Sequence, residues 1–175
     1  MLTPEEEKKK FELYRKQGYK PKNFAEENEI DFVLGELENK KVVYVACGYQ
    51  HTACVTEDGF LYTWGFGKNG ALGHGDWNEV VLPKKVEKLS NIVKVECGID
   101  YTMCIDKEGK LYSWGSNRYG QLGVSGTNTY KINKPTLIHL PHAVSKVADF
   151  TCGEEHSAFL TDKGEVYTWG YGNDG

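Results

Sequence analysis

The stretch ACGYQHTACVTEDGFLYTWG, residues 46–65, occurs three times in related form and decides the fold. The second copy is ECGIDYTMCIDKEGKLYSWG at 96–115, and the third is TCGEEHSAFLTDKGEVYTWG at 151–170. The spacing from Cys-Gly to Trp-Gly is the same in all three, and the three tryptophans lie 50 and 55 residues apart. Such a period indicates one supersecondary unit used repeatedly, and β-propeller blades fall in this range.

Each copy predicts short strands, because runs rich in Val, Tyr and Thr alternate with turn signals such as Asp58-Gly59. The expected strands are 42–47, 51–56 and 60–64 in copy one, 93–97, 101–105 and 110–114 in copy two, and 147–152, 156–160 and 165–169 in copy three. A fourth strand is expected near 84–86 and 135–138. Pro83 and Pro135 indicate an edge or outer position there, since proline donates no hydrogen bond to a ladder.

Three elements together resemble the repeats of the regulator of chromosome condensation family: Cys-Gly-x-x-His-Thr/Ser, the Tyr-x-Trp-Gly run, and Gly-Gln-Leu-Gly. The best match runs from Trp114 to Gly123. Copy one departs from it, with Gly67 and Ala71 where copy two has asparagine and glutamine. The resemblance implies a β-propeller of four-stranded blades, seven in complete members. We therefore expect an all-β fold of about three propeller blades at 42–91, 92–143 and 144–175, the last incomplete.

Residues 1–41 lie outside the repeat and predict an N-terminal helical arm. Thr3-Pro4 offers a hydroxyl N-cap and a proline at the first helical position, and the helix is expected to run to Gln17. Phe11 and Tyr14 lie three residues apart and can share one helix face. From Asn23 onward we expect a second short helix or an extended arm.

Composition restricts the class of protein. The chain has 175 residues and a formal net charge of −4, with an isoelectric point of about 5.8. It therefore lacks a basic footprint for nucleic acid. No apolar run approaches the about 18 residues of a membrane span, and the acidic N-terminus is unlike a signal peptide. We expect an intracellular, cytoplasmic protein, with cytoskeletal or organellar association left open.

The cysteines and histidines of the repeat have a structural interpretation. Cys54 and Cys104 share their repeat position with Phe159, which indicates a buried apolar site. Cys47–His51 has a spacing that suggests a metal site, but copy two has Tyr101 in the histidine place. We expect no metal and no cofactor, and we expect these histidines to form a hydrogen-bonded turn and strand start inside each blade.

Residues outside the repeat phase are the candidate partner-binding residues. Trp77, beside Asp76, is the one tryptophan out of phase, and it is either an interface anchor or packed on the neighbouring loop. Tyr130 and Lys131 lie in the loop that carries the five extra residues of the second repeat. Phe11 and Tyr14 complete the set on the predicted arm.

The leading functional hypothesis is a non-catalytic protein-interaction scaffold, since no P-loop, Gly-x-Ser-x-Gly or His-Glu-x-x-His motif is present. The resemblance implies one alternative, guanine-nucleotide exchange on a small GTPase. A structural subunit of a cytoskeletal or organellar assembly is another. Three repeats leave blade faces uncovered, so we expect a longer propeller, self-association, or a larger complex.

Overall fold

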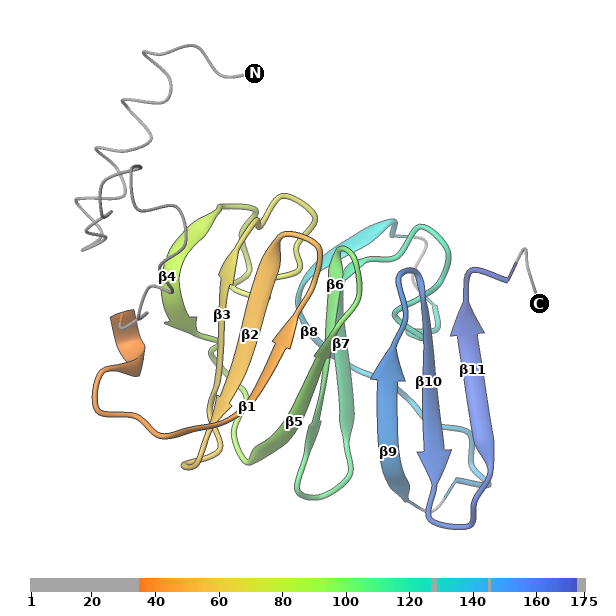
Figure 1. Ribbon diagram of the computed structural model, residues 1–175. Helices are drawn as coiled ribbons and strands as arrows, with labels where there is room; N and C mark the ends of the chain where they lie inside the picture. Colours follow the sequence, from red (N-terminus) through yellow and green to blue (C-terminus); the bar gives the residue numbers. More distant parts are fainter. Residues whose placement is uncertain (1–34, 127–128, 145, 173–175) are drawn as a thin grey trace.

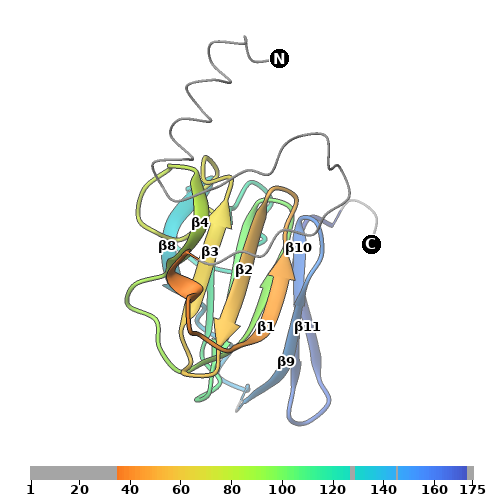
Figure 2. The ribbon, with the colours of Figure 1, turned by 60° about the vertical axis from the view of Figure 1, so that its left-hand side comes forward.

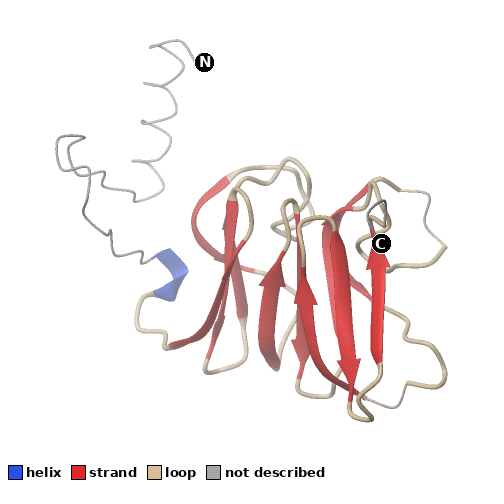
Figure 3. Cartoon of the chain, turned by 45° about the vertical axis from the view of Figure 1, so that its right-hand side comes forward, coloured by secondary structure: helices blue, strands red, loops and turns tan. Residues whose placement is uncertain are grey.

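The computed structural model describes residues 35–126, 129–144 and 146–172. They form three antiparallel sheets that stand side by side like the blades of a propeller, as expected (Figure 1). Apart from one 3-10 turn, η1 (Gly35–Leu37), the regular structure of these residues is all strand (Figure 3). None of the described helices is long and apolar enough to cross a membrane.

The chain builds each blade as a meander, from the inner strand outward. Blade one has the order β1 (Val42–Cys47), β2 (His51–Thr56), β3 (Leu61–Gly65) and β4 (Val80–Lys85). Blade two repeats it with β5 (Ile92–Cys97), β6 (Tyr101–Asp106), β7 (Leu111–Ser116) and β8 (Lys131–Leu137). Blade three has β9 (Val147–Cys152), β10 (His156–Thr161) and β11 (Val166–Gly170).

The predicted strands match the observed ones within a residue or two, except the fourth. Strands β4 and β8 begin four residues before the expected 84–86 and 135–138, at Val80 and Lys131. Both strands start earlier than predicted because the pairing continues to the ends of their partners: Gly65 of β3 pairs with Val80, and Ser116 of β7 pairs with Lys131. Both strands are the outermost of their blades, so the position inferred from Pro83 and Pro135 is confirmed.

The core lies between blades rather than within one. One cluster joins blades one and two, and it includes Leu61, Val95 and Trp114. A second joins blades two and three, and it includes Leu111, Phe150 and Phe159. Each blade therefore buries one face against the next, and the repeat tryptophan Trp114 lies in the interface between blades one and two.

The outward faces of the first and third blades pack against no other described blade, and their apolar side chains are exposed. Val45 of blade one is 62% exposed, whereas Val95, at the same repeat position of blade two, is fully buried. On the other side, Val166 of blade three is exposed where Leu111 of blade two is buried. As the repeat pattern predicts, apolar blade faces stay uncovered within the described part of the chain.

The predicted N-terminal helix, with Phe11 and Tyr14, lies outside the described residues. The described chain begins on the outer edge of blade one. There a Glu36 carboxylate oxygen accepts a hydrogen bond of 3.0 Å from the backbone N–H of Lys85 in β4. A Cβ placed on Gly35 would lie 3.0 Å from the side chain of Leu82, so η1 is in close contact with that strand.

Candidate partner-binding face

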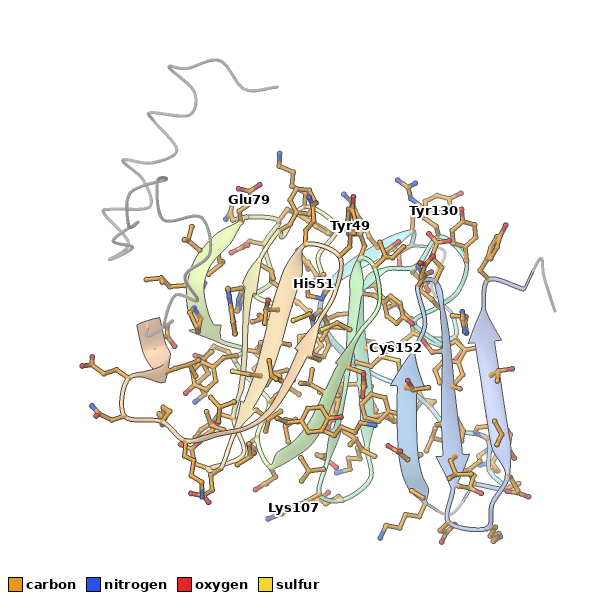
Figure 4. All side chains as sticks on the ribbon, in the orientation of Figure 1. Tyr49, His51, Glu79, Lys107, Tyr130 and Cys152 are labelled. Atoms are coloured by element: carbon orange, nitrogen blue, oxygen red, sulfur yellow. The ribbon has the colours of Figure 1, made fainter. Side chains whose placement is uncertain are left out.

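Two kinds of connection meet at one end of the three blades. The turns between the first and second strands of each blade (48–50, 98–100 and 153–155) lie there, because the strands are antiparallel. The long loops after β3 and β7 (66–79 and 117–130) lie at the same end. We call this end, with Tyr171 after β11, the loop face. Figure 4 shows Tyr49, Glu79 and Tyr130 on it, and Lys107 at the opposite end.

Exposed aromatic side chains gather on the loop face. Tyr49 and Tyr130 are each 75% exposed, and the other three are 40–44% exposed. The full set is Tyr49, Trp77, Tyr119, Tyr130 and Tyr171. Every exposed Tyr, Trp or Phe of the described chain belongs to this set.

The structure brings two of the predicted residues into contact. The Nζ atom of Lys131, at the start of β8, lies 4.5 Å from the centre of the Trp77 ring. The same atom donates a hydrogen bond of 3.2 Å to the backbone carbonyl of Lys68. The loop of blade one is tied to β8 by a further bond of 2.8 Å, from Gly75 N–H to the Asn133 carbonyl. The loop of blade one and strand β8 of blade two therefore build one continuous surface around Trp77.

The other predicted loop residues have different surroundings. The Asp76 carboxylate accepts a hydrogen bond of 3.0 Å from the backbone N–H of Asn78, so it shapes the turn that presents Trp77. The Tyr130 carbonyl accepts a bond of 2.7 Å from the Asn117 N–H, while its side chain stays exposed. Phe11 and Tyr14 lie outside the described residues.

Three residues of the loop face were missed by the sequence interpretation: Tyr49, Tyr119 and Tyr171. Each of them occupies a position of the repeat, and the sequence interpretation gave every repeat position a structural role. A signal was present, because the position of Tyr49 holds Ile99 and Glu154 in the other copies. A position that varies so widely between copies is not required by the blade. Tyr119 and Tyr171 also touch edge to face across two blades, with ring centres 4.7 Å apart.

Beneath the loop face, polar contacts join one blade to the next. The Ala71 carbonyl of blade one accepts hydrogen bonds of 2.8 Å from Trp114 Nε1 and 2.8 Å from the Thr102 hydroxyl, both of blade two. The Gln121 carbonyl accepts the equivalent pair, at 2.9 Å each, from Trp169 and Ser157 of blade three. Residues at the same repeat positions thus form the same pair of hydrogen bonds at both blade interfaces.

His51 forms the expected hydrogen-bonded turn within its blade, where its carbonyl accepts a bond of 2.9 Å from the Gly48 N–H, and its side chain also reaches the next blade. His51 begins β2 as expected, but its Nε2 lies 2.8 Å from the Thr102 hydroxyl of the next blade. Because that hydroxyl gives its proton to the Ala71 carbonyl, Nε2 must be the donor. Burial lowers the pKa of His51 to about 4, so the imidazole is neutral near pH 7. Tyr101, at the same repeat position, also reaches blade three: its hydroxyl donates to the His156 carbonyl and lies 2.9 Å from the Ser157 hydroxyl.

The five cysteines lie in two kinds of environment. Cys54 and Cys104 are buried, as their exchange with phenylalanine predicts, and burial raises the pKa of Cys54 to about 11. Cys47, Cys97 and Cys152 end the inner strands and line a depression of about 440 Å³. All five are free thiols, and Cys47 is exposed. Among the described residues, no group of three or more His, Cys, Asp or Glu side chains is placed to hold a metal ion.

The geometry defines a class, the repeat β-propeller with four-stranded blades. Family models for the regulator of chromosome condensation (RCC1) repeat match residues 58–105 and 108–160, and a second RCC1-repeat model matches 42–71, 92–121 and 147–175. The chain belongs to the RCC1-repeat family, which confirms the resemblance seen in its sequence.

Known relatives agree in sequence and in structure. The chain is 41% identical over 136 residues to the ultraviolet-B receptor UVR8 of Arabidopsis thaliana, a match that covers 78% of this chain and 31% of the receptor. The crystal structure of human WBSCR16 superposes with a TM-score of 0.72 at 31% identity, over 79% of this chain and 35% of that one. Prp20p of Saccharomyces cerevisiae gives 0.68 at 27% identity, over 78% and 32%. The chain thus spans about a third of each of these relatives.

Proposed function

We propose that this chain is a non-catalytic protein-binding module and that a partner protein docks on its loop face. The observation that carries the proposal is the confinement of the exposed aromatic side chains of the described residues to that one end. Tyrosine and tryptophan are enriched among the residues that contribute most to protein–protein affinity. In repeat proteins, loops on one face commonly form the binding surface.

The surroundings of Trp77 support its role as an anchor. The Lys131 ammonium covers part of the ring, and the Gly70 backbone lies so close that a Cβ there would be 2.9 Å from the indole. The ring is therefore held in one orientation while 41% of the residue stays exposed. An anchor that is ordered before binding loses little conformational entropy when a partner covers it.

The chemistry of the described residues favours binding over catalysis. Strongly shifted pKa values often mark catalytic groups. Here the groups with large shifts include His51, Tyr101 and Cys104, and burial is the leading cause for each. His51 and Tyr101 bond across blade interfaces, and Cys104 lies in the core between blades one and two. Their shifts therefore follow from packing between blades.

Site-specific photo-crosslinking tests the proposal. A photoreactive amino acid would replace Tyr130 on the loop face and, as a matched control, Lys107 at the opposite end, in cells that express the full-length protein. We expect a discrete crosslinked partner from position 130 and none from position 107, with Trp77→Ala reducing the yield at least tenfold. Equal crosslinking from both ends, or no effect of Trp77→Ala, would contradict the proposal.

A second candidate is guanine-nucleotide exchange on a small GTPase. Its support is the similarity to Prp20p, whose structure is described together with its binding to Gsp1p and histones. Release of a fluorescent guanine nucleotide from a panel of small GTPases, with and without the protein, tests this candidate. No acceleration across the panel would remove it and leave the binding module intact. The structural-subunit hypothesis rests on residues 1–34, outside the described chain, and stays a prediction.

A further inference from the structure

A cavity of about 330 Å³ opens on the outer side of blades one and two, apart from the exposed aromatic residues of the loop face. It lies between the outer strands β4 and β8, which Figure 2 shows on the same side of the molecule. Its polar lining includes His74, Lys84, Lys88 and Lys134. A volume near 300 Å³ is at the lower end of the range for small-molecule sites, which fits a metabolite-sized ligand rather than a polymer.

Strand register directs Lys84 into this cavity. Lys84 of β4 pairs with Thr63 of β3, so both side chains leave the same face of the sheet. The Thr63 hydroxyl lies 3.1 Å from His74 Nε2, which places that face on the cavity side. The neighbouring Lys85 points the other way, with its Nζ 3.7 Å from the centre of the Phe60 ring.

Two further lysines reach the cavity from different elements. The Lys134 side chain of β8 crosses Gly75, where an added Cβ would lie 3.2 Å from its Cε atom. Lys88, in the link from blade one to blade two, has a φ of +68°, a backbone conformation uncommon outside glycine. Lys84, Lys88 and Lys134 are all exposed, so each ammonium can reach a ligand from solvent.

The local charge opposes that of the whole chain. Four lysines (Lys84, Lys85, Lys88 and Lys134) and one carboxylate, that of Glu87, line the cavity, whereas the protein carries a net charge of −4. The Lys85 ammonium lies over the Phe60 ring, so the other three lysines and Glu87 leave a net +2 with His74 neutral. The ion pairs among the described residues involve other lysines. This excess of positive over negative charge creates a positive potential that attracts anions.

We propose that this cavity binds a small phosphate-bearing ligand, with the phosphate among Lys84, Lys88 and Lys134. Lysine ammonium groups bind phosphate as point charges, and a doubly charged phosphate monoester gains more than a monoanion from several of them. The organic part of the ligand would lie against Leu89, Tyr112 and Pro135, which form the less polar wall. The cavity shares Gly73, His74 and Gly75 of the loop 66–79 with the loop face, but none of the five exposed aromatic residues of that face lines it.

His74 gives an internal reporter of phosphate binding. Burial and then the charge of Lys84 lower the pKa of His74, while a hydrogen bond with Thr63 and the charges of Asp76 and Glu36 act in the opposite direction. Lys88, Lys134 and Glu87 are the other charged groups that line the cavity with Lys84 and Lys85. A bound phosphate adds negative charge beside the ring and stabilises the imidazolium. Binding should therefore move the His74 titration to higher pH.

The experiment is an NMR titration of the full chain with phenyl phosphate at constant ionic strength. We expect saturable shifts confined to residues around Gly75, Lys84 and Lys88, and an upward move of the His74 titration. Inorganic phosphate is the second probe, and it should bind at least threefold more weakly because it lacks the organic part. Equal affinity for both probes would overturn the assignment of the apolar wall.

Two charge-matched double variants separate a built site from general attraction. Lys84→Gln with Lys134→Gln should weaken binding of phenyl phosphate at least tenfold. Lys107→Gln with Lys163→Gln removes the same charge from exposed turns elsewhere and should change affinity less than twofold. Both variants should unfold at the wild-type temperature. Equal weakening in both, shifts without saturation, or an unmoved His74 titration would overturn the site.

Discussion

The indole N–H of Trp114 in blade two donates a hydrogen bond of 2.8 Å to the backbone carbonyl of Ala71 in blade one. The same tryptophan is fully buried in the cluster that joins the two blades. One side chain of the repeat thus supplies both the apolar contact and the polar contact of a blade interface. Its removal should therefore loosen the interface rather than the blade that carries it.

The first prediction concerns this contact. Trp114→Phe removes the indole donor and part of the buried volume, and it should lower the free energy of unfolding by about 1–2 kcal/mol. Trp114→Ala also leaves a cavity and should cost about 3–5 kcal/mol. Denaturant unfolding followed by far-ultraviolet circular dichroism measures both. Trp77→Phe, on the loop face, is the control and should cost less than about 0.5 kcal/mol. A cost for Trp77→Phe as large as that for Trp114→Phe would contradict the assigned roles.

A matched pair of glycines tests how tightly the interface is packed. Gly73 and Gly120 have φ angles of +76° and +77°, so alanine strains both backbones alike. A Cβ on Gly73 would lie 2.7 Å from Trp114 Nε1, whereas a Cβ on Gly120 meets nothing within 4 Å.

Gly120→Ala should therefore cost only the backbone strain of about 1–2 kcal/mol. Gly73→Ala should cost about 1–3 kcal/mol more, because the added methyl group displaces the indole from its hydrogen bond. Denaturant midpoints of the two variants give the difference directly. Equal losses of stability would mean that the Trp114 indole can move aside without cost, and that the blade interface is not close-packed at Gly73.

The repeat made most of the fold predictable from the sequence. Each inner strand is a local apolar run, and the Asp-Gly turns mark the hairpins, so β2 was placed residue for residue at His51–Thr56. The starts of β4 and β8 were predicted four residues too late, because both strands pair along β3 and β7 as far as Val80 and Lys131. The partner of His51 was missed for a related reason, since Thr102 belongs to another blade.

The candidate site was only partly predictable. Trp77 and Lys131 stood out because they lie outside the repeat phase, but nothing in the sequence shows that they touch. That contact depends on the loop of blade one reaching β8 of blade two. Tyr49, Tyr119 and Tyr171 were missed because a repeat position was equated with a structural role. The exposed fractions show that a repeat position can also face solvent.

The pH dependence of stability follows from His51. Its pKa in the folded chain is lowered to about 4, against an ordinary value of 6.5, so the folded state favours the neutral ring. The unfolded chain binds the proton as pH falls below 6.5, and stability is lost from there down to about pH 4. The full loss from this one group is at most about 3 kcal/mol.

The check compares wild type with His51→Gln, which keeps a donor for Thr102 but does not titrate. Urea unfolding at pH 7.5 and pH 5 should show a smaller loss for the variant than for wild type, by about 1–2 kcal/mol. The remaining loss in the variant comes from other groups, including His74, whose pKa is also lowered by burial. The same loss in both proteins would show that His51 is protonated in the folded chain.

Thiol reactivity tests the positions of the five cysteines. Cys47 is exposed and should react first with iodoacetamide at pH 7.5. Cys54 and Cys104 are buried, and burial raises the pKa of both thiols, that of Cys54 to about 11. Since the thiolate is the reactive form, these two should react at least about 100-fold more slowly than Cys47.

Mass spectrometry of peptides after timed alkylation resolves the five rates. Cys97 and Cys152 are partly exposed but have raised pKa values, chiefly through burial, so they should fall between the two extremes. In concentrated urea the order should disappear, because all five thiols are then solvated alike. Cys104 lies in the cluster between blades one and two. If it reacted as fast as Cys47 in the folded protein, that interface would have to open on the timescale of the reaction.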